Sequence, residues 1–190
     1  MSVSLLDRFV MNAEKITLDD KAILKICNNQ VNIIPYSSLT QYTDIFQFLG
    51  TYSASIIFYE VSSKYDGHWV CLLFHRDTKT IELWDSYGMN DEQILDRAHT
   101  SEALVNERPI LTELIHNACI KYGLKYVYNN HRFQSNNMKI ATCGRYASLR
   151  ARFKEFSLSK FNRLLIDNLN PDYIVSCLTV MFSDEANNYV

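Results

Sequence analysis

The stretch from Ser53 to Asp85 constrains the fold most strongly, because its hydrophobic pattern is that of consecutive β-strands. Segments rich in β-branched and aromatic residues alternate there with short polar turns: strands at 53–61, 68–75 and 80–85, with turns at 62–67 and 76–79. Apolar residues occupy both faces of the middle segment, so we expect it to lie in the centre of a sheet.

The turn between the last two of these strands has a chemical consequence. An even turn, centred between Asp77 and Thr78, places Val70 opposite Asp85. His68 then lies on the same face as Asp85, one diagonal step of about 7–8 Å away, which an imidazole and a carboxylate can bridge. The hairpin is therefore predicted to bring His68 and Asp85 together, whereas an odd turn would separate their faces.

The rest of the chain is mainly helical in its pattern. An extended link at 33–36, a weakly patterned stretch at 86–106 with one helical turn, a strand at 124–128 and a polar loop at 129–137 are expected between helices. Helices are expected at 4–15, from a Thr17/Asp20 cap to Cys27, from Thr43 to Gly50, from Pro109 to Gly123, from Cys143, from Ser157 to Asn168, and from Asn170-Pro171. Two buried stripes are predicted: Ile110, Leu114, Ile115, Ala118 and Tyr122, and Ile174, Leu178 and Met181.

Composition limits the class of protein. A chain of 190 residues that is 47% hydrophobic suits one compact α+β domain, and its net charge of −2 gives no general reason to expect nucleic-acid binding. It has no run of about 20 apolar residues and no basic-then-apolar leader, so we expect no membrane segment and no secretion. Its five cysteines do not form a disulfide pattern, which favours a reducing compartment such as cytoplasm or nucleus.

Cys143 is the candidate nucleophile. It opens a helix crowded with small residues, and a helix N-terminus favours the thiolate. Gly144, which has no side chain, allows a substrate backbone to approach. The alternative is a buried structural cysteine, the commoner role of this residue type.

Thiol catalysis also needs a base, a group that orients the base, and donors for an oxyanion. His68 can be the base and Asp85 the orienting acceptor. Gln134, together with the backbone N–H of Cys143, can form the oxyanion hole. Taken singly, His68 is more often a structural strand-end histidine and Asp85 a turn-capping residue.

Taken together and in order, these residues carry a family resemblance. Gly67-His68-Trp69, Trp84-Asp85-Ser86, Gln134 and Thr142-Cys143-Gly144 resemble the adenain and ubiquitin-like-protein (SUMO-type) protease clan of cysteine peptidases. The resemblance covers about residues 53–153 and includes the spacing within the pattern. It implies a central mixed sheet flanked by helices, the papain-like or adenain-like fold, with the nucleophile at the N-terminus of a buried helix. It also implies that Trp69 packs near the catalytic imidazole.

The resemblance sets the expected function. It divides the chain into a helical lead-in at 1–50, a catalytic core at 53–153 and C-terminal helices at 154–190. The aspartate acid is shared by SUMO-type proteases and many viral members, and the short chain favours the maturation proteases of double-stranded DNA viruses and virophages. These cleave capsid or core precursors at Gly-Gly-X or Gly-X-Gly sequences, in the virion, cytoplasm or nucleus. We expect a monomer that requires no cofactor, with activation by DNA or a peptide left open.

Other hypotheses remain. A protease for ubiquitin-like modifiers on host conjugates, an acyltransferase with a similar residue set, and an inactive binding module would each keep the fold. The basic residues after Cys143 are expected to form a solvated face rather than a DNA track: Arg145, Arg150, Arg152 and Lys154. The remaining histidines, 75, 99, 116 and 131, are expected to be surface or structural.

The remaining cysteines are expected to be inert. Cys71, Cys119 and Cys177 are expected in the core, and Cys27 partly exposed. His116 and Cys119 share a helix face but lack a second ligand pair, so no metal site is expected.

Overall fold

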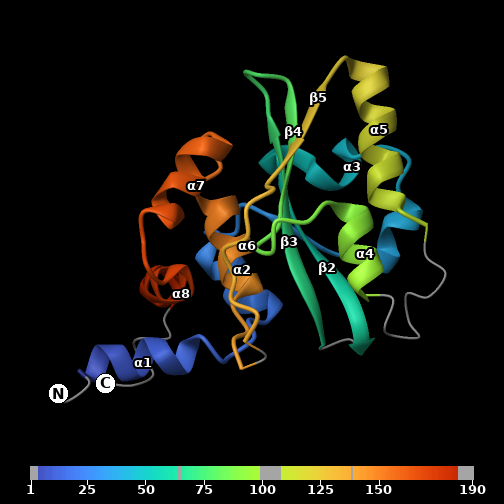
Figure 1. The fold of residues 1–190 in the computed structure, drawn as a ribbon. Coiled ribbons are helices and arrows are strands. Elements are labelled where there is room, and N and C mark those ends of the chain that lie inside the picture. The colour runs from blue at the N-terminus through green and yellow to red at the C-terminus, as the bar shows by residue number, and fades with distance from the viewer. Residues whose placement is uncertain (1–3, 64–65, 99–107, 138, 184–190) are drawn as a thin grey trace.

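One five-stranded sheet organises the protein, and its strands follow each other in sequence order, β1-β2-β3-β4-β5. The computed structural model describes residues 4–63, 66–98, 108–137 and 139–183 (Figure 1). The strands are β1 (Asn32–Pro35), β2 (Ala54–Ser63), β3 (Asp66–His75), β4 (Thr80–Trp84) and β5 (Lys125–Tyr128). The two outer pairs, β1–β2 and β4–β5, are parallel, and the inner pairs are antiparallel. The expected mixed sheet is confirmed.

The β3–β4 hairpin has the register that the sequence predicts. Cys71 pairs with Trp84, and His75 pairs with Thr80. One further step in this register places Val70 opposite Asp85, with His68 on the same face. The hairpin register therefore places the imidazole of His68 within reach of the carboxylate of Asp85.

Helices cover both faces of the sheet (Figure 1). The face that carries Cys71 and Trp84 packs against α2, α6, α7 and α8. The opposite face, which carries Val70 and Leu72, packs against η1, α3, α4 and α5. The helices are α1 (Leu5–Ala13), α2 (Asp20–Ile26), η1 (Tyr36–Gln41), α3 (Phe46–Leu49), η2 (Gly50–Tyr52), α4 (Asp91–Ala98), α5 (Ile110–Tyr122), α6 (Cys143–Arg152), α7 (Leu158–Ile166) and α8 (Pro171–Phe182).

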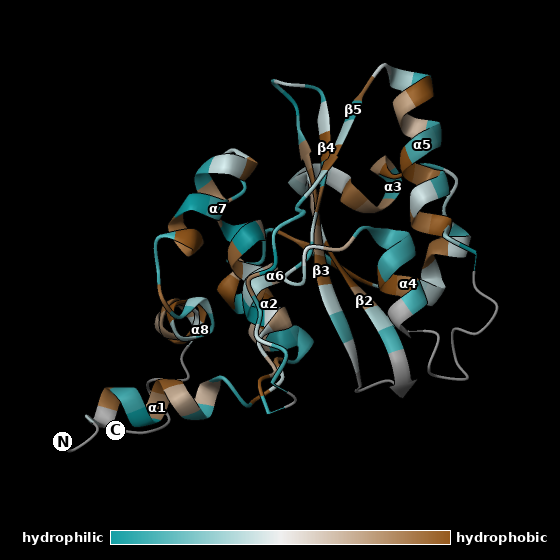
Figure 2. Cartoon of the chain, viewed as in Figure 1, coloured by the Kyte–Doolittle hydropathy of each residue, from teal (hydrophilic) through white to brown (hydrophobic). Residues whose placement is uncertain are grey.

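Strand alternation produces the two cores. Ile56 and Phe58 point to the α6 side, whereas Ile57 and Tyr59 point to the α5 side, because successive side chains of a strand face opposite ways. The middle stretches of the central strands are accordingly coloured as hydrophobic in Figure 2. A sheet that is buried on both faces holds its side chains in fixed positions, and this makes it a firm base for a site.

Several local expectations were wrong. Residues 33–36 are not only a link, because most of them pair with β2 as an edge strand. The expected loop at 62–67 is largely strand, and α4 replaces much of the loop at 86–106. Residues 99–107 of that loop lie outside the described part of the chain. In α2 the N-cap is Asp19 rather than Thr17, because its Oδ1 accepts a hydrogen bond from the Ala22 N–H at 2.8 Å.

The predicted buried stripe is largely correct in α5, whereas in α8 the predicted Ile174 and Leu178 are only half-buried. In α5, Leu111 is buried together with Leu114, Ile115 and Ala118, but Tyr122 is exposed. In α8, Met181 is exposed. The buried positions of α8 are Asp172, Val175, Ser176, Thr179 and Val180. The buried face of α8 differs from the predicted apolar stripe because it includes polar residues that have hydrogen-bond partners inside the protein, such as Thr179.

Two expectations about side-chain exposure are corrected. Arg145 and Arg150 are fully buried and form no solvated face. Arg145 donates to the carbonyl of Ala13 at 3.1 Å and to Oγ1 of Thr179 at 2.8 Å. Neither arginine can reach a nucleic acid from this position.

The cysteines also differ from expectation. Cys27 is buried rather than partly exposed, and Cys119 and Cys177 are half-buried rather than in the core. Only Cys71, of the three assigned to the core, is fully enclosed. Among the described helices, none has the length and apolarity that crossing a membrane requires.

Candidate active site

Three elements meet at the candidate site, and each supplies one side chain. β3 carries His68, the residue after β4 is Asp85, and α6 begins with Cys143. The imidazole Nε2 of His68 is hydrogen-bonded to Oδ1 of Asp85. The thiol of Cys143 hydrogen-bonds to the imidazole of His68. Because Asp85 occupies Nε2, the other ring nitrogen, Nδ1, is left for the sulfur.

Asp85 is held rigidly. Its side chain is completely buried. Its second oxygen, Oδ2, accepts hydrogen bonds from the backbone N–H groups of Tyr87 at 3.0 Å and Met89 at 2.9 Å. The turn that presents these N–H groups passes so close to His131 that a Cβ on Gly88 would lie 2.8 Å from the His131 carbonyl carbon. This turn therefore fixes the carboxylate toward His68.

The charges of the pair support one another. Burial by itself lowers the pKa of His68, but the Asp85 carboxylate and the Cys143 sulfur outweigh it and raise that pKa to about 10. Burial likewise raises the pKa of Cys143, but the hydrogen bond and charge of His68 lower it below the ordinary thiol value. The favoured state is thus a thiolate beside an imidazolium.

Backbone donors complete the surroundings of the sulfur. The N–H groups of Trp69 and Gly144 both donate to Cys143, and Gly144 belongs to the first turn of α6. The helix start therefore stabilises negative charge at the sulfur, as the sequence suggests. Gly144 also packs closely, because a Cβ there would lie 3.2 Å from Cδ1 of Trp69, so the Trp69 ring would have to shift slightly to admit a larger residue.

Gln134 is tied to the site through Ser86. The Ser86 hydroxyl donates to Oε1 of Gln134 at 2.7 Å, and the Gln134 N–H donates back to the Ser86 carbonyl at 3.0 Å. The side-chain bond fixes which end of the amide accepts, so the NH2 group is left as the donor end. Gln134 is buried, which favours strong hydrogen bonding by that group.

Trp69 lies under the start of α6, beside the nucleophile. Its ring packs on Phe58, with centroids 4.3 Å apart, and it borders Gly144. The aromatic ring beside the imidazole of His68 is that of Tyr87, at 5.2 Å. Tyr87 was missed because a tyrosine in a turn carries no sequence signal for this role.

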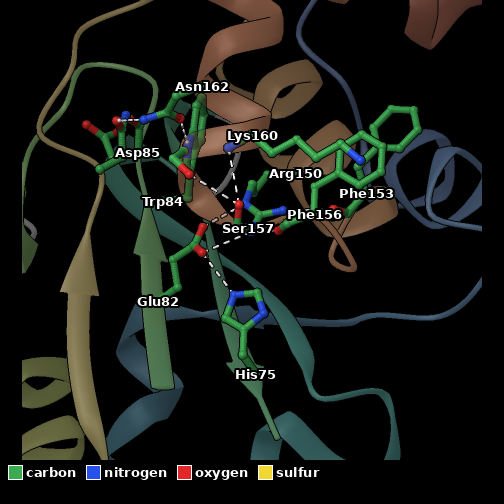
Figure 3. Close-up of polar contacts among 12 residues, drawn as sticks. His75, Glu82, Trp84, Asp85, Arg150, Phe153, Phe156, Ser157, Lys160 and Asn162 are labelled. Atoms are coloured by element: carbon green, nitrogen blue, oxygen red, sulfur yellow. Dashed lines mark hydrogen bonds and ion pairs between the residues drawn. The ribbon is translucent and has the colours of Figure 1, made fainter. Parts of the chain in front are cut away.

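A second set of residues braces the same three elements, as Figure 3 shows. Arg150 of α6 donates from Nε and Nη2 to the two carboxylate oxygens of Glu82 on β4, at 2.6 and 2.9 Å. His75 of β3 contacts Oε2 of Glu82 at 2.9 Å. Arg150 and Glu82 are both buried. β3 and α6 therefore each hold one residue of this brace and one of the candidate triad, and β4 holds Glu82 and leads directly into Asp85.

The brace gives a prediction about stability. Arg150→Met leaves the Glu82 carboxylate buried without its main counter-ion, so the free energy of unfolding should fall by about 3–5 kcal/mol in urea titrations. Lys154→Met is the matched control, because Lys154 donates to the carbonyl of Tyr52 at the surface and should cost less than about 1 kcal/mol. Equal losses in the two variants would contradict this role.

Metal chemistry finds no support in the part of the chain that is described, where no group of three or more His, Cys, Asp or Glu side chains could hold an ion. The brace, Ser86 and Tyr87 are the residues that sequence reasoning missed. A charged residue inside an apolar strand, as Glu82 is, is the one signal that could have pointed to a buried partner.

Comparisons with known proteins place the chain in a family. No protein-family profile matches it. The uncharacterized protein V9 of the Sputnik virophage is 32% identical over 174 residues, which cover 88% of this chain and 96% of V9.

Solved structures of the SUMO protease Ulp1 are more distant. One with its catalytic cysteine oxidized to a sulfenic acid has 14% identity and a TM-score of 0.43, covering 95% of this chain and 84% of that one. The C-terminal Ulp1 protease domain in complex with Smt3, the yeast ortholog of SUMO, has 13% identity and a TM-score of 0.42, covering 93% and 82%. The similarity to V9 extends over nearly the whole of both sequences. The chain therefore belongs to the family of this virophage protein.

Proposed function

We propose that the protein is a cysteine endopeptidase in which Cys143 is the nucleophile, His68 the acid and base, and Asp85 the group that orients His68. The observation that carries this proposal is the convergence of the three side chains, with the pKa of Cys143 lowered and that of His68 raised to about 10. A thiolate–imidazolium pair at a helix start is suited to attack on a carbonyl carbon.

The proposed reaction has two steps. The thiolate bonds to the carbonyl carbon, and His68 gives its proton to the departing amine as the peptide bond breaks. Water then attacks the thioester carbon and loses a proton to His68. The carbon–sulfur bond breaks, the carboxylic acid product leaves, and the Cys143 thiolate is restored. The Cys143 N–H and the amide NH2 of Gln134 stabilise the oxyanion in both steps.

The substrate proposed is a capsid or core precursor protein, cleaved at glycine-containing sequences during virion maturation. Membership of a virophage protein family supports this setting, and the resemblance of the sequence motifs to viral maturation proteases supports the cleavage preference. No cofactor is needed by this mechanism, and a monomer suffices, since one chain supplies every group. Virion, host cytoplasm and nucleus are the proposed locations.

The pH dependence of Cys143 alkylation tests the ion pair. The rate with iodoacetamide should already be on a plateau near neutral pH, because the pKa of Cys143 is lowered, and should rise again above about pH 10 as His68 loses its proton. In His68→Ala the plateau should disappear and the rate should follow a thiol pKa above 8.5. A profile identical in both proteins would argue against the pair.

Added DNA and virion peptides test the open question of activation. A plateau that arises only in their presence would show that the site needs an activator. A suicide probe built on a folded ubiquitin-like modifier tests the competing substrate class. If the modifier probe labels Cys143 and glycine-rich virion peptides are not cut, the protein would be a protease for ubiquitin-like modifiers and not a maturation protease.

A further inference from the structure

One carboxylate outside the candidate triad holds both ends of the segment that leads to the nucleophile. Asp172 of α8 is buried. Its Oδ2 accepts a hydrogen bond from the Ser135 N–H at 3.0 Å, and its Oδ1 accepts one from Oγ1 of Thr142 at 2.5 Å. Bonds to a charged acceptor are stronger than neutral ones. Asp172 thus joins two points that lie seven positions apart in the sequence.

The two points are next to the two oxyanion donors. Ser135 directly follows Gln134, whose amide is one proposed donor, and Thr142 directly precedes Cys143, whose N–H is the other. The relative position of the donors therefore depends on the segment that Asp172 closes. The Ala141 N–H is held as well, by the carbonyl of Glu14 at 2.7 Å, so the end nearer the nucleophile is anchored twice.

Asp172 is itself well fixed. It lies in the first turn of α8, directly after Pro171, and Oδ1 of Asn170 caps this turn by accepting from the Tyr173 N–H at 3.2 Å. A carboxylate in the first turn is favoured by the helix dipole. The rest of α8 is held against α6, where Thr179 accepts a hydrogen bond from Arg145.

The bond from Thr142 has a second effect. Thr142 is the N-cap of α6, yet its side chain caps nothing, because the hydroxyl is turned to Asp172. A threonine at this position usually accepts a hydrogen bond from an N–H of the first turn. The Thr142 hydroxyl therefore does not occupy an N–H group of this turn, where negative charge at the sulfur and at the oxyanion would be stabilised.

We propose that Asp172 is a positioning residue, which sets the distance between the two oxyanion donors by binding Ser135 and Thr142 at once. The proposal rests on the proposed peptidase function. It concerns the stabilisation of the tetrahedral oxyanion and not the formation of the thiolate, and these two steps can be measured separately.

The experiment compares two small reagents on the whole chain. Iodoacetamide alkylates the thiolate by displacement and forms no oxyanion. With p-nitrophenyl acetate, Cys143 bonds to the carbonyl carbon, an oxyanion forms, p-nitrophenolate leaves, and water later releases acetate. In Asp172→Asn the amide NH2 cannot accept a hydrogen bond, so acylation should fall about 10–100-fold while alkylation stays within about threefold of wild type.

Matched variants separate positioning from stability. Thr142→Val should lower acylation selectively, and Thr142→Ser, which keeps the hydroxyl, should restore it. Thr179→Val removes a buried hydrogen bond from Arg145 but no contact of Ser135 or Thr142, so it should lower the melting temperature without changing the ratio of the two rates. If Asp172→Asn does not fold, the Thr142 pair decides the matter.

The outcomes are distinct. Acylation equally fast in wild type and Cys143→Ala would defeat the proposed function itself. Acylation that needs Cys143 but is unchanged in Asp172→Asn and Thr142→Val would overturn the positioning role alone. A parallel fall in alkylation and acylation would also overturn it, because the thiolate rather than the oxyanion hole would then be affected.

Discussion

Cys143→Ala should lower the cleavage of a glycine-containing virion peptide by about 10⁴-fold or more, with no change of fold. The expected loss is large because Cys143 is the residue that would form the covalent intermediate, and members of such a set fail together when the nucleophile is removed. Initial rates of peptide cleavage measure the loss, and circular dichroism with a thermal melt measures the fold.

Cys27→Ala is the control for this variant. Cys27 is also buried, but burial raises its pKa to about 12, and its thiol donates to the Ser148 carbonyl at 3.5 Å. Such a thiol is unreactive at neutral pH, so cleavage by Cys27→Ala should remain close to wild type. Cleavage that survives the loss of Cys143 would rule out the proposed mechanism.

Asp85→Asn should lower kcat/KM by about 10³–10⁴-fold, since the same change in a serine triad costs about 10⁴. The amide NH2 can face either His68 or the backbone N–H groups of Tyr87 and Met89. If the NH2 group faces His68, it donates to Nε2, so the imidazole proton sits on Nδ1. Nδ1 then cannot accept the proton of the Cys143 thiol. If the NH2 group faces the backbone instead, it points its own N–H donors at the N–H donors of Tyr87 and Met89, and the hydrogen bonds to these two groups are lost.

The same variant should change the thiol titration. Without the carboxylate, burial lowers the pKa of His68, the imidazolium is lost at neutral pH, and the pKa of Cys143 rises. The plateau in iodoacetamide alkylation near pH 7 should therefore vanish. An unchanged kcat/KM in Asp85→Asn would show that His68 is oriented by something else.

Asp91→Asn is the matched control for this change. Asp91 is equally buried, and it accepts hydrogen bonds from the Tyr59 hydroxyl at 2.6 Å and the Thr112 N–H at 2.8 Å. Its loss should lower the melting temperature while kcat/KM stays within a few-fold of wild type. The comparison separates the loss of a buried carboxylate from the loss of the carboxylate that faces His68.

The part of the site that depends on local sequence could be predicted. The turn at 76–79 sets the β3–β4 register, and the register alone makes His68 a neighbour of Asp85. Helix starts at Ser157 and Asn170 were also predicted, because their caps lie within three residues of the N–H groups they bind. Such contacts involve short loops and few alternatives.

Contacts between distant segments could not be predicted in the same way. Arg150 looked like a solvent-facing arginine until Glu82, from another element, was seen to neutralise it. Asp172 reads as an ordinary first-turn acid, and only the tertiary fold brings Thr142 to it. Their partners lie far away in the sequence, and no periodic pattern encodes which charged groups will be buried together.

The position of the nucleophile on α6 has a consequence for folding. The hairpin that joins His68 and Asp85 is local, with a separation of 17 residues, whereas Cys143 reaches them only when α6 docks on β3. Contacts of high sequence separation form late and require loop closure. A nascent or partly folded chain therefore carries a base without its thiol. The proposed proteolytic activity should accordingly appear only when the whole tertiary structure has formed, and activity and tertiary structure should be lost together in a single denaturation transition.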